Sequence, residues 1–128
     1  MERVVHQNLR RLGLAVLALA LVFGAAIPAS GLGWSTQQTG TYDGCQYRFL
    51  WGTWVANYPA AKTVDENGGC QYQYVKAWDS DETHIHGPTA SNPAIVVFND
   101  HDYSKTAKWQ VTTWEHGWTV TKQKTFSS

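Results

Sequence analysis

A short polar segment concentrates the side chains best suited to chemistry. Asp79 to His86 reads DSDETHIH, which contains three carboxylates, two hydroxyls and two imidazoles. In an extended chain alternate side chains share a face at roughly 6 to 7 Å spacing, so Glu82, His84 and His86 would line one face. Imidazoles favour zinc or copper, whereas carboxylates favour calcium. We therefore take Glu82, His84 and His86, with His101 from the later Asp-His-Asp segment, as candidate metal ligands.

The same segment has a simpler interpretation. A polar edge and turn before Gly87-Pro88 would present these charges to solvent without binding an ion. A structural zinc site normally has four ligands at recognisable spacing, and this segment does not supply them. We expect no cofactor, and we keep zinc, copper or calcium as the alternative.

Catalytic motifs are missing from the sequence. There is no Gly-x-Ser-x-Gly elbow to present a nucleophilic serine. Asp79 and Asp81 are of the type used as an acid and base pair, but glycosidase carboxylates are identified by their separation in space. We assign no catalytic residue, and the sequence favours a binding protein over an enzyme.

The two cysteines lie in two copies of one tetrapeptide. Gly44 to Tyr47 and Gly69 to Tyr72 both read GCQY, and no third copy exists. A tandem-repeat fold needs at least about three units, so two strands with matched starts explain the similarity better. An even pair of cysteines in an exported chain predicts a disulfide, here Cys45 to Cys70.

The N-terminus has the pattern of a secretory signal peptide. Arginines lie within Met1 to Arg11, an uncharged apolar run follows from Leu12 to Ile27, and Pro28 to Gly31 offers small residues for cleavage. The apolar run is shorter than the roughly 18 to 20 residues of a membrane span. We expect residues 1–31 to be removed and residues 32–128 to form one secreted domain, in a chain of bacterial type.

Charge excludes some partners of that domain. Removing 31 of 128 residues leaves 97, with seven Lys or Arg against nine Asp or Glu, a net charge of −2. Nucleic-acid binding normally needs a basic surface, and a membrane surface is normally bound by a basic amphipathic helix. We expect neither nucleic acid nor membrane as a partner of the mature form.

The pattern of the mature chain is that of strands. Cys45 to Trp54 and Cys70 to Trp78 alternate, Ala94 to Phe98 has the apolar pattern of a buried central strand, and Ala60 to Val64 has the length of a helical turn. Two more strand-like segments, 108–114 and 118–124, flank a turn and form an expected hairpin. The predicted fold is all-β, a small antiparallel sandwich or small barrel of about six or seven strands with one disulfide.

Aromatic residues form the strongest candidate binding surface. All seven tryptophans follow the signal, which is more than a core of this size needs. Trp51 and Trp54 bracket Gly52-Thr53, and Trp114 and Trp118 bracket the turn at 115–117, so these four are the candidate ligand-binding residues. Tryptophans near loops offer flat platforms for sugar rings and anchors for proteins.

These features predict a secreted, non-catalytic protein that binds an extracellular glycan or protein through exposed aromatic side chains. The alternative is a secreted effector, either an enzyme inhibitor or a bacteriocin-like antimicrobial. A third hypothesis is a metal-binding protein or metalloenzyme that uses Glu82, His84 and His86.

Overall fold

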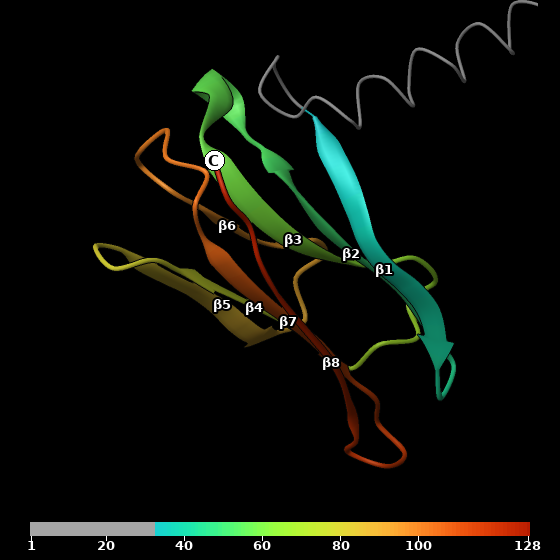
Figure 1. The fold of residues 1–128 in the computed structure, drawn as a ribbon. Coiled ribbons are helices and arrows are strands. Elements are labelled where there is room, and N and C mark those ends of the chain that lie inside the picture. Colours follow the sequence, from blue (N-terminus) through green and yellow to red (C-terminus); the bar gives the residue numbers. More distant parts are fainter. Residues whose placement is uncertain (1–32) are drawn as a thin grey trace, which may run out of the picture.

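Two antiparallel sheets of four strands each make up the fold (Figure 1). The computed structural model describes residues 33–128. Sheet A contains, in spatial order, β1 (Trp34–Tyr42), β2 (Cys45–Thr53), β3 (Pro59–Asp65) and β6 (Ala94–Val97). Sheet B contains β5 (Thr83–Thr89), β4 (Tyr72–Trp78), β7 (Thr106–Thr112) and β8 (Thr119–Thr125). A single 3₁₀ turn, η1 (Val55–Asn57), follows β2.

The predicted antiparallel sandwich with one disulfide is confirmed, and the barrel alternative is not. Hydrogen-bonded strand pairing stays within each sheet of the described residues, so the two sheets pack face to face. Residues 33–128 form eight strands rather than about six or seven. The expected signal peptide, residues 1–31, lies outside the described part of the chain. No helix within residues 33–128 has the length and hydropathy needed to cross a membrane.

One of the unexpected strands, β1, has a polar sequence. It reads WSTQQTGTY and lacks a clear apolar alternation, but it pairs along β2 with a bulge between Thr36 and Gln38. Gly52 makes the start of this pairing possible, because a Cβ there would lie 1.9 Å from the carbonyl oxygen of Gly33. The formation of β1 is therefore determined by its pairing with the buried strand β2 and not by the composition of β1 itself.

Two other expectations are wrong. The apolar run Ala94 to Phe98 was expected to form a central strand, but β6 is an edge strand that pairs only with β3. Its alternate residues are buried in the core, and Ile95 and Val97 between them are partly exposed. Ala60 to Val64, expected as a helical turn, forms most of β3, because pairing with β2 and β6 outweighs the local preference of its alanines.

The core lies between the sheets and is rich in aromatic rings. The Phe49 and Trp109 rings stack across it with centroids 6.1 Å apart, and the Trp51 and Phe126 rings stack at 4.2 Å. The predicted Cys45–Cys70 disulfide is present and joins the first residue of β2 to the segment that leads into β4. The disulfide therefore ties sheet A to sheet B.

A buried lysine closes the opposite end of the core. Lys105 is 1% exposed and its Nζ lies 2.9 Å from Asp100 Oδ1, within reach of Asp79, and 4.6 Å from the Phe98 ring centroid. Burial alone lowers the pKa of Lys105, but the hydrogen bonds with Asp79 and Asp100 outweigh it and raise that pKa above the usual value. Lys105 therefore links the loops after β4 and β6 as a charged group.

The loops gather at two ends of the sandwich. Cys45 and Thr53 are the two ends of β2, so the β1–β2 turn and η1 lie at opposite ends (Figure 1). The β7–β8 loop lies at the end of the β1–β2 turn, where a hydrogen bond joins the two. Any site built from loop residues must therefore belong to one end or the other.

Candidate functional site

The four tryptophans predicted to bind ligand fall in three different environments. Trp51 is 4% exposed and stacks in the core, so it presents no surface to a ligand. Trp54 is 41% exposed and lies next to η1, with its ring edge-on to Trp34 at 6.4 Å. Trp114 and Trp118 are 63% and 67% exposed and lie together in the β7–β8 loop at the other end. The structure therefore brings only Trp114 and Trp118 into one candidate site.

A hydrogen-bonded clamp holds the loop that carries Trp114 and Trp118. Asp43 Oδ2 accepts a hydrogen bond from the Thr113 hydroxyl at 2.7 Å and lies 2.9 Å from His116 Nδ1. The His116 hydrogen bond, with that of Thr113, lowers the pKa of Asp43, and the same Asp43 carboxylate raises the pKa of His116. Gly117 adopts a φ of +60° and turns the chain back towards β8, as the hairpin prediction requires.

The clamp was not predicted, because Asp43 lies 73 residues before His116 in the sequence. Within residues 33–128, the group formed by Asp43, Glu115 and His116 is the one set of three potential metal ligands whose ligating atoms all lie within 4.8 Å of each other. The group is exposed, and the Asp43–His116 ion pair accounts for its proximity. We interpret this group as a clamp for the loop.

The predicted metal ligands Glu82, His84 and His86 lie where the sequence places them. Glu82 immediately precedes β5, and these three side chains are partly buried while Thr83 and Ile85 are exposed, which confirms the expected division into two faces. His84 Nε2 contacts Glu82 Oε1, and its ring packs edge-on against Phe98.

A hydrogen bond to His86 joins the two sheets. His86 Nδ1 accepts a hydrogen bond from the Ile95 amide at 3.0 Å, which links the edge strands β5 and β6. His101 lies elsewhere: its ring stacks on Tyr58 at 4.7 Å and its Nε2 lies 2.8 Å from the Ala56 carbonyl oxygen. In the described residues these four side chains do not form a compact ligand group, so metal binding by them stays a prediction.

A shallow groove runs over the outer face of sheet B. Its volume is about 320 Å³, and the side chains that line it come from β4, β5, β7 and β8; they include Tyr72, Tyr74, Pro88, Gln110, Thr112 and Thr119. Tyr72 is 42% exposed. Thr112 is paired with both Tyr72 and Thr119, and the loop between Thr112 and Thr119 carries the two exposed tryptophans. We call this surface, with Trp114 and Trp118, the aromatic groove.

The sequence contains a signal for this surface. Strand alternation places Tyr72, Tyr74, Lys76 and Trp78 on one face of β4, and the structure leaves that face outside the core. A lysine within an aromatic face indicates that the face meets solvent, because a charged amine is costly to bury. Lys76 Nζ in fact lies over the Trp78 ring, 5.1 Å from its centroid.

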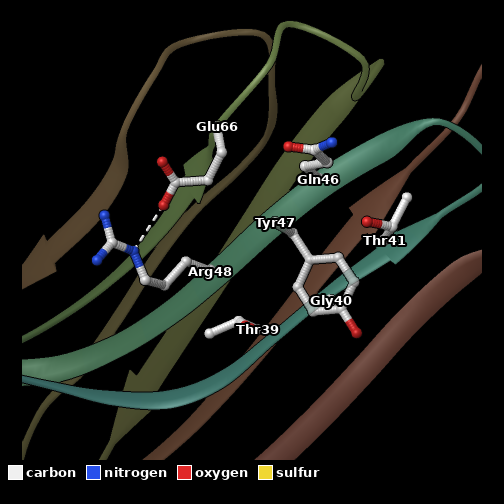
Figure 2. Close-up of a pocket in the computed structure, with 7 residues that line it drawn as sticks. All are labelled: Thr39, Gly40, Thr41, Gln46, Tyr47, Arg48 and Glu66. Atoms are coloured by element: carbon white, nitrogen blue, oxygen red, sulfur yellow. Dashed lines mark ion pairs between the residues drawn. The ribbon is translucent and has the colours of Figure 1, made fainter.

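A second pocket, of about 530 Å³, lies on sheet A (Figure 2). Its lining residues come from β1, β2 and the segment after β3; they are Thr39, Gly40, Thr41, Gln46, Tyr47, Arg48 and Glu66. Figure 2 shows Arg48 reaching towards Glu66, and Arg48 Nε lies 2.6 Å from Glu66 Oε1. In contrast to the aromatic groove, this pocket is lined mainly by polar side chains.

Comparisons with known proteins leave the function to be argued from these surfaces. No family model, no curated protein and no solved structure matches the chain. The function is therefore inferred from the geometry and side-chain chemistry of the aromatic groove and the sheet A pocket.

Proposed function

We propose that this protein is a secreted, non-catalytic binding protein that recognises a neutral extracellular glycan chain through the aromatic groove. The observation that carries the proposal is that Thr112 and Thr119, which line the groove on sheet B, flank the loop that exposes Trp114 and Trp118. The disulfide is compatible with an extracellular protein, because disulfides persist in oxidising compartments.

The chemistry of the groove suits a sugar chain. A pyranose ring has an apolar C–H face and polar hydroxyls at its rim, so it needs flat aromatic surface beside donors and acceptors. The groove offers tyrosine rings together with the amide of Gln110 and the hydroxyls of Thr112 and Thr119. Its lining contains no carboxylate and no ammonium group, which favours an uncharged ligand.

The aromatic groove is held in place in the absence of a ligand. The strands beneath it form one hydrogen-bonded sheet, and the Asp43 clamp holds the loop at Thr113 and His116. A preorganised surface loses less conformational entropy on binding than a mobile one. Binding without large rearrangement is therefore expected.

Retention of the purified protein on insoluble polysaccharides and on a panel of neutral glycans tests the proposal. The wild-type protein should be retained by at least one neutral glycan, and the double variant Trp114→Ala/Trp118→Ala should not. Trp54→Ala is the matched control, because Trp54 is also exposed but lies at the opposite end.

A different outcome would favour the effector alternative. If neutral glycans fail to retain the protein while a protein target or a hydrolase does, and the two loop tryptophans are needed, the aromatic groove is a protein-binding surface. A loss of retention in Trp54→Ala alone would instead assign ligand contact to Trp54, at the η1 end of the sandwich.

A further inference from the structure

The polar pocket on sheet A has the composition of a second ligand site. Thr39 lies opposite Arg48 and Thr41 lies opposite Gln46 in the β1–β2 register, and paired residues project on the same side of a sheet. Figure 2 shows Arg48 and Glu66 on one side of the pocket and Thr41 on the other. Its volume of about 530 Å³ falls within the range typical of small-molecule sites.

The ion pair in this pocket leaves hydrogen-bonding capacity on both partners. Arg48 and Glu66 are about two-fifths exposed, at 44% and 37% for their side chains. Arg48 Nε contacts Glu66 Oε1 as an ion pair without hydrogen-bond geometry, and within residues 33–128 the Arg48 Nη groups and Glu66 Oε2 make no hydrogen bond. A ligand in the pocket therefore meets up to four N–H donors beside one carboxylate acceptor.

These two groups select for the charge of the ligand. An anion attracted by Arg48 would be repelled by the Glu66 carboxylate, and a cation attracted by Glu66 would be repelled by Arg48. A hydroxyl avoids both conflicts, because it accepts a hydrogen bond from a guanidinium and donates one to a carboxylate. Two neighbouring hydroxyls would satisfy both partners of the pair at once.

We propose that the sheet A pocket binds one neutral sugar ring through a pair of vicinal hydroxyls, with Arg48 as donor and Glu66 as acceptor. The exposed Thr39, Thr41 and Gln46 supply further hydroxyl and amide contacts to the rest of the ring. Tyr47 is 7% exposed, so the pocket has no stacking platform and contacts the sugar through its polar edge.

The pocket is built on a rigid part of the fold. The Glu66 amide donates to the Gln46 carbonyl at 2.8 Å, and the Gln46 amide donates to Asn67 Oδ1 at 3.1 Å. These bonds hold the segment after β3 beside β2, where Arg48 lies. Side chains supported by regular strands keep the spacing that a hydrogen-bonding site requires.

The position of the sheet A pocket, on the face opposite the aromatic groove, would allow the protein to bind two glycan chains at once. The pocket lies on sheet A, whereas the aromatic groove lies on sheet B, so the two surfaces face away from each other across the core. A protein with sugar sites on both faces can join two glycan chains. Binding of a single sugar by the pocket does not depend on the proposed function of the groove.

Saturation-transfer NMR of the purified protein with glucose, galactose and mannose tests the pocket directly. At least one of these sugars should bind with a Kd of about 1 mM, and Arg48→Gln and Glu66→Gln should each weaken it by about tenfold or more. Glucuronate and glucosamine serve as the charged comparisons and should bind more weakly. All of these measurements are made on protein that also carries Trp114→Ala/Trp118→Ala, so that a sugar bound at the aromatic groove does not contribute to the signal.

The stability of each variant is measured alongside binding. Glu66→Gln keeps the shape of the side chain, so an unchanged unfolding midpoint with lost sugar binding supports the proposal. Absence of a signal from all three neutral sugars, or stronger binding of glucuronate than of any of them, would overturn it. Neutral-sugar binding that survives both Arg48→Gln and Glu66→Gln would overturn it as well.

Discussion

The imidazole of His116 lies 2.9 Å from the carboxylate of Asp43, and this contact joins the loop between β7 and β8 to the turn between β1 and β2. The β7–β8 loop carries the two most exposed tryptophans, Trp114 and Trp118. One ion pair therefore connects the two sheets at the end where the aromatic groove opens. Its charge state depends on pH, which makes the position of the loop testable.

The Asp43–His116 pair should contribute to stability in a defined pH window. Asp43 raises the pKa of His116, so the contribution of His116 is complete below about pH 6.5 and is lost as pH rises through the raised pKa. His116 lowers the pKa of Asp43, so the contribution of Asp43 is present above about pH 3.8 and is lost as pH falls through the lowered pKa. The clamp is therefore strongest between about pH 4 and 6.5.

An NMR titration of the His116 ring measures this directly. Asp43→Asn should shift the His116 titration to lower pH and speed amide exchange in the loop at pH 5. Asn tolerates the positive φ of 49° at position 43, so the turn itself should persist. A His116 titration that is the same in wild type and Asp43→Asn would show that the clamp is not formed in solution.

The Cys45–Cys70 disulfide should supply a large share of the stability. It closes a loop with a sequence separation of 25 residues. In the chain-entropy model this crosslink stabilises the folded state by about 3.5 kcal/mol, so the double variant Cys45→Ser/Cys70→Ser should lose about that much free energy of unfolding. Urea denaturation provides the measurement, and a loss below about 1 kcal/mol would contradict the entropic account.

Replacing the buried lysine should also destabilise the fold. Lys105→Met leaves Asp79, whose side chain is 10% exposed, and Asp100, whose side chain is 41% exposed, without their shared cation. Breaking a fully buried pair from one side typically costs about 3 to 5 kcal/mol. Because Asp100 keeps contact with water, we expect the free energy of unfolding to fall by about 1 to 3 kcal/mol. Lys108→Met, on the outer face of sheet B, is the control and should change the free energy of unfolding by less than about 0.5 kcal/mol. Equal effects from the two substitutions would contradict the structural role of Lys105.

Local sequence patterns predicted the parts of the fold that alternate strongly. The alternation after Cys45 gave β2, the turn at Gly117 gave the β7–β8 hairpin, and export with an even cysteine count gave the disulfide. β1 was not predicted, because its polar residues are ordered by pairing with β2. β6 was misplaced, because an apolar run does not distinguish a central strand from an edge strand with one buried face.

The candidate sites depend on register and distant contacts, which a single sequence does not contain. The sequence marked Trp114 and Trp118 as neighbours of a turn, but it did not separate them from the buried Trp51. The Asp43–His116 contact spans 73 residues. The pocket at Arg48 requires the register between β1 and β2 across a bulge, and its partner Glu66 follows β3.

The most direct test of the account is calorimetric titration of the protein with a soluble oligosaccharide from the glycan that retains it best. We predict that Trp114→Ala/Trp118→Ala weakens binding by at least about 100-fold, because exposed tryptophans at a binding surface are typical hot spots worth about 2 kcal/mol or more. Trp54→Ala should stay within about twofold of wild type. Unchanged affinity in the double variant, or an equal loss in Trp54→Ala, would contradict recognition through the aromatic groove.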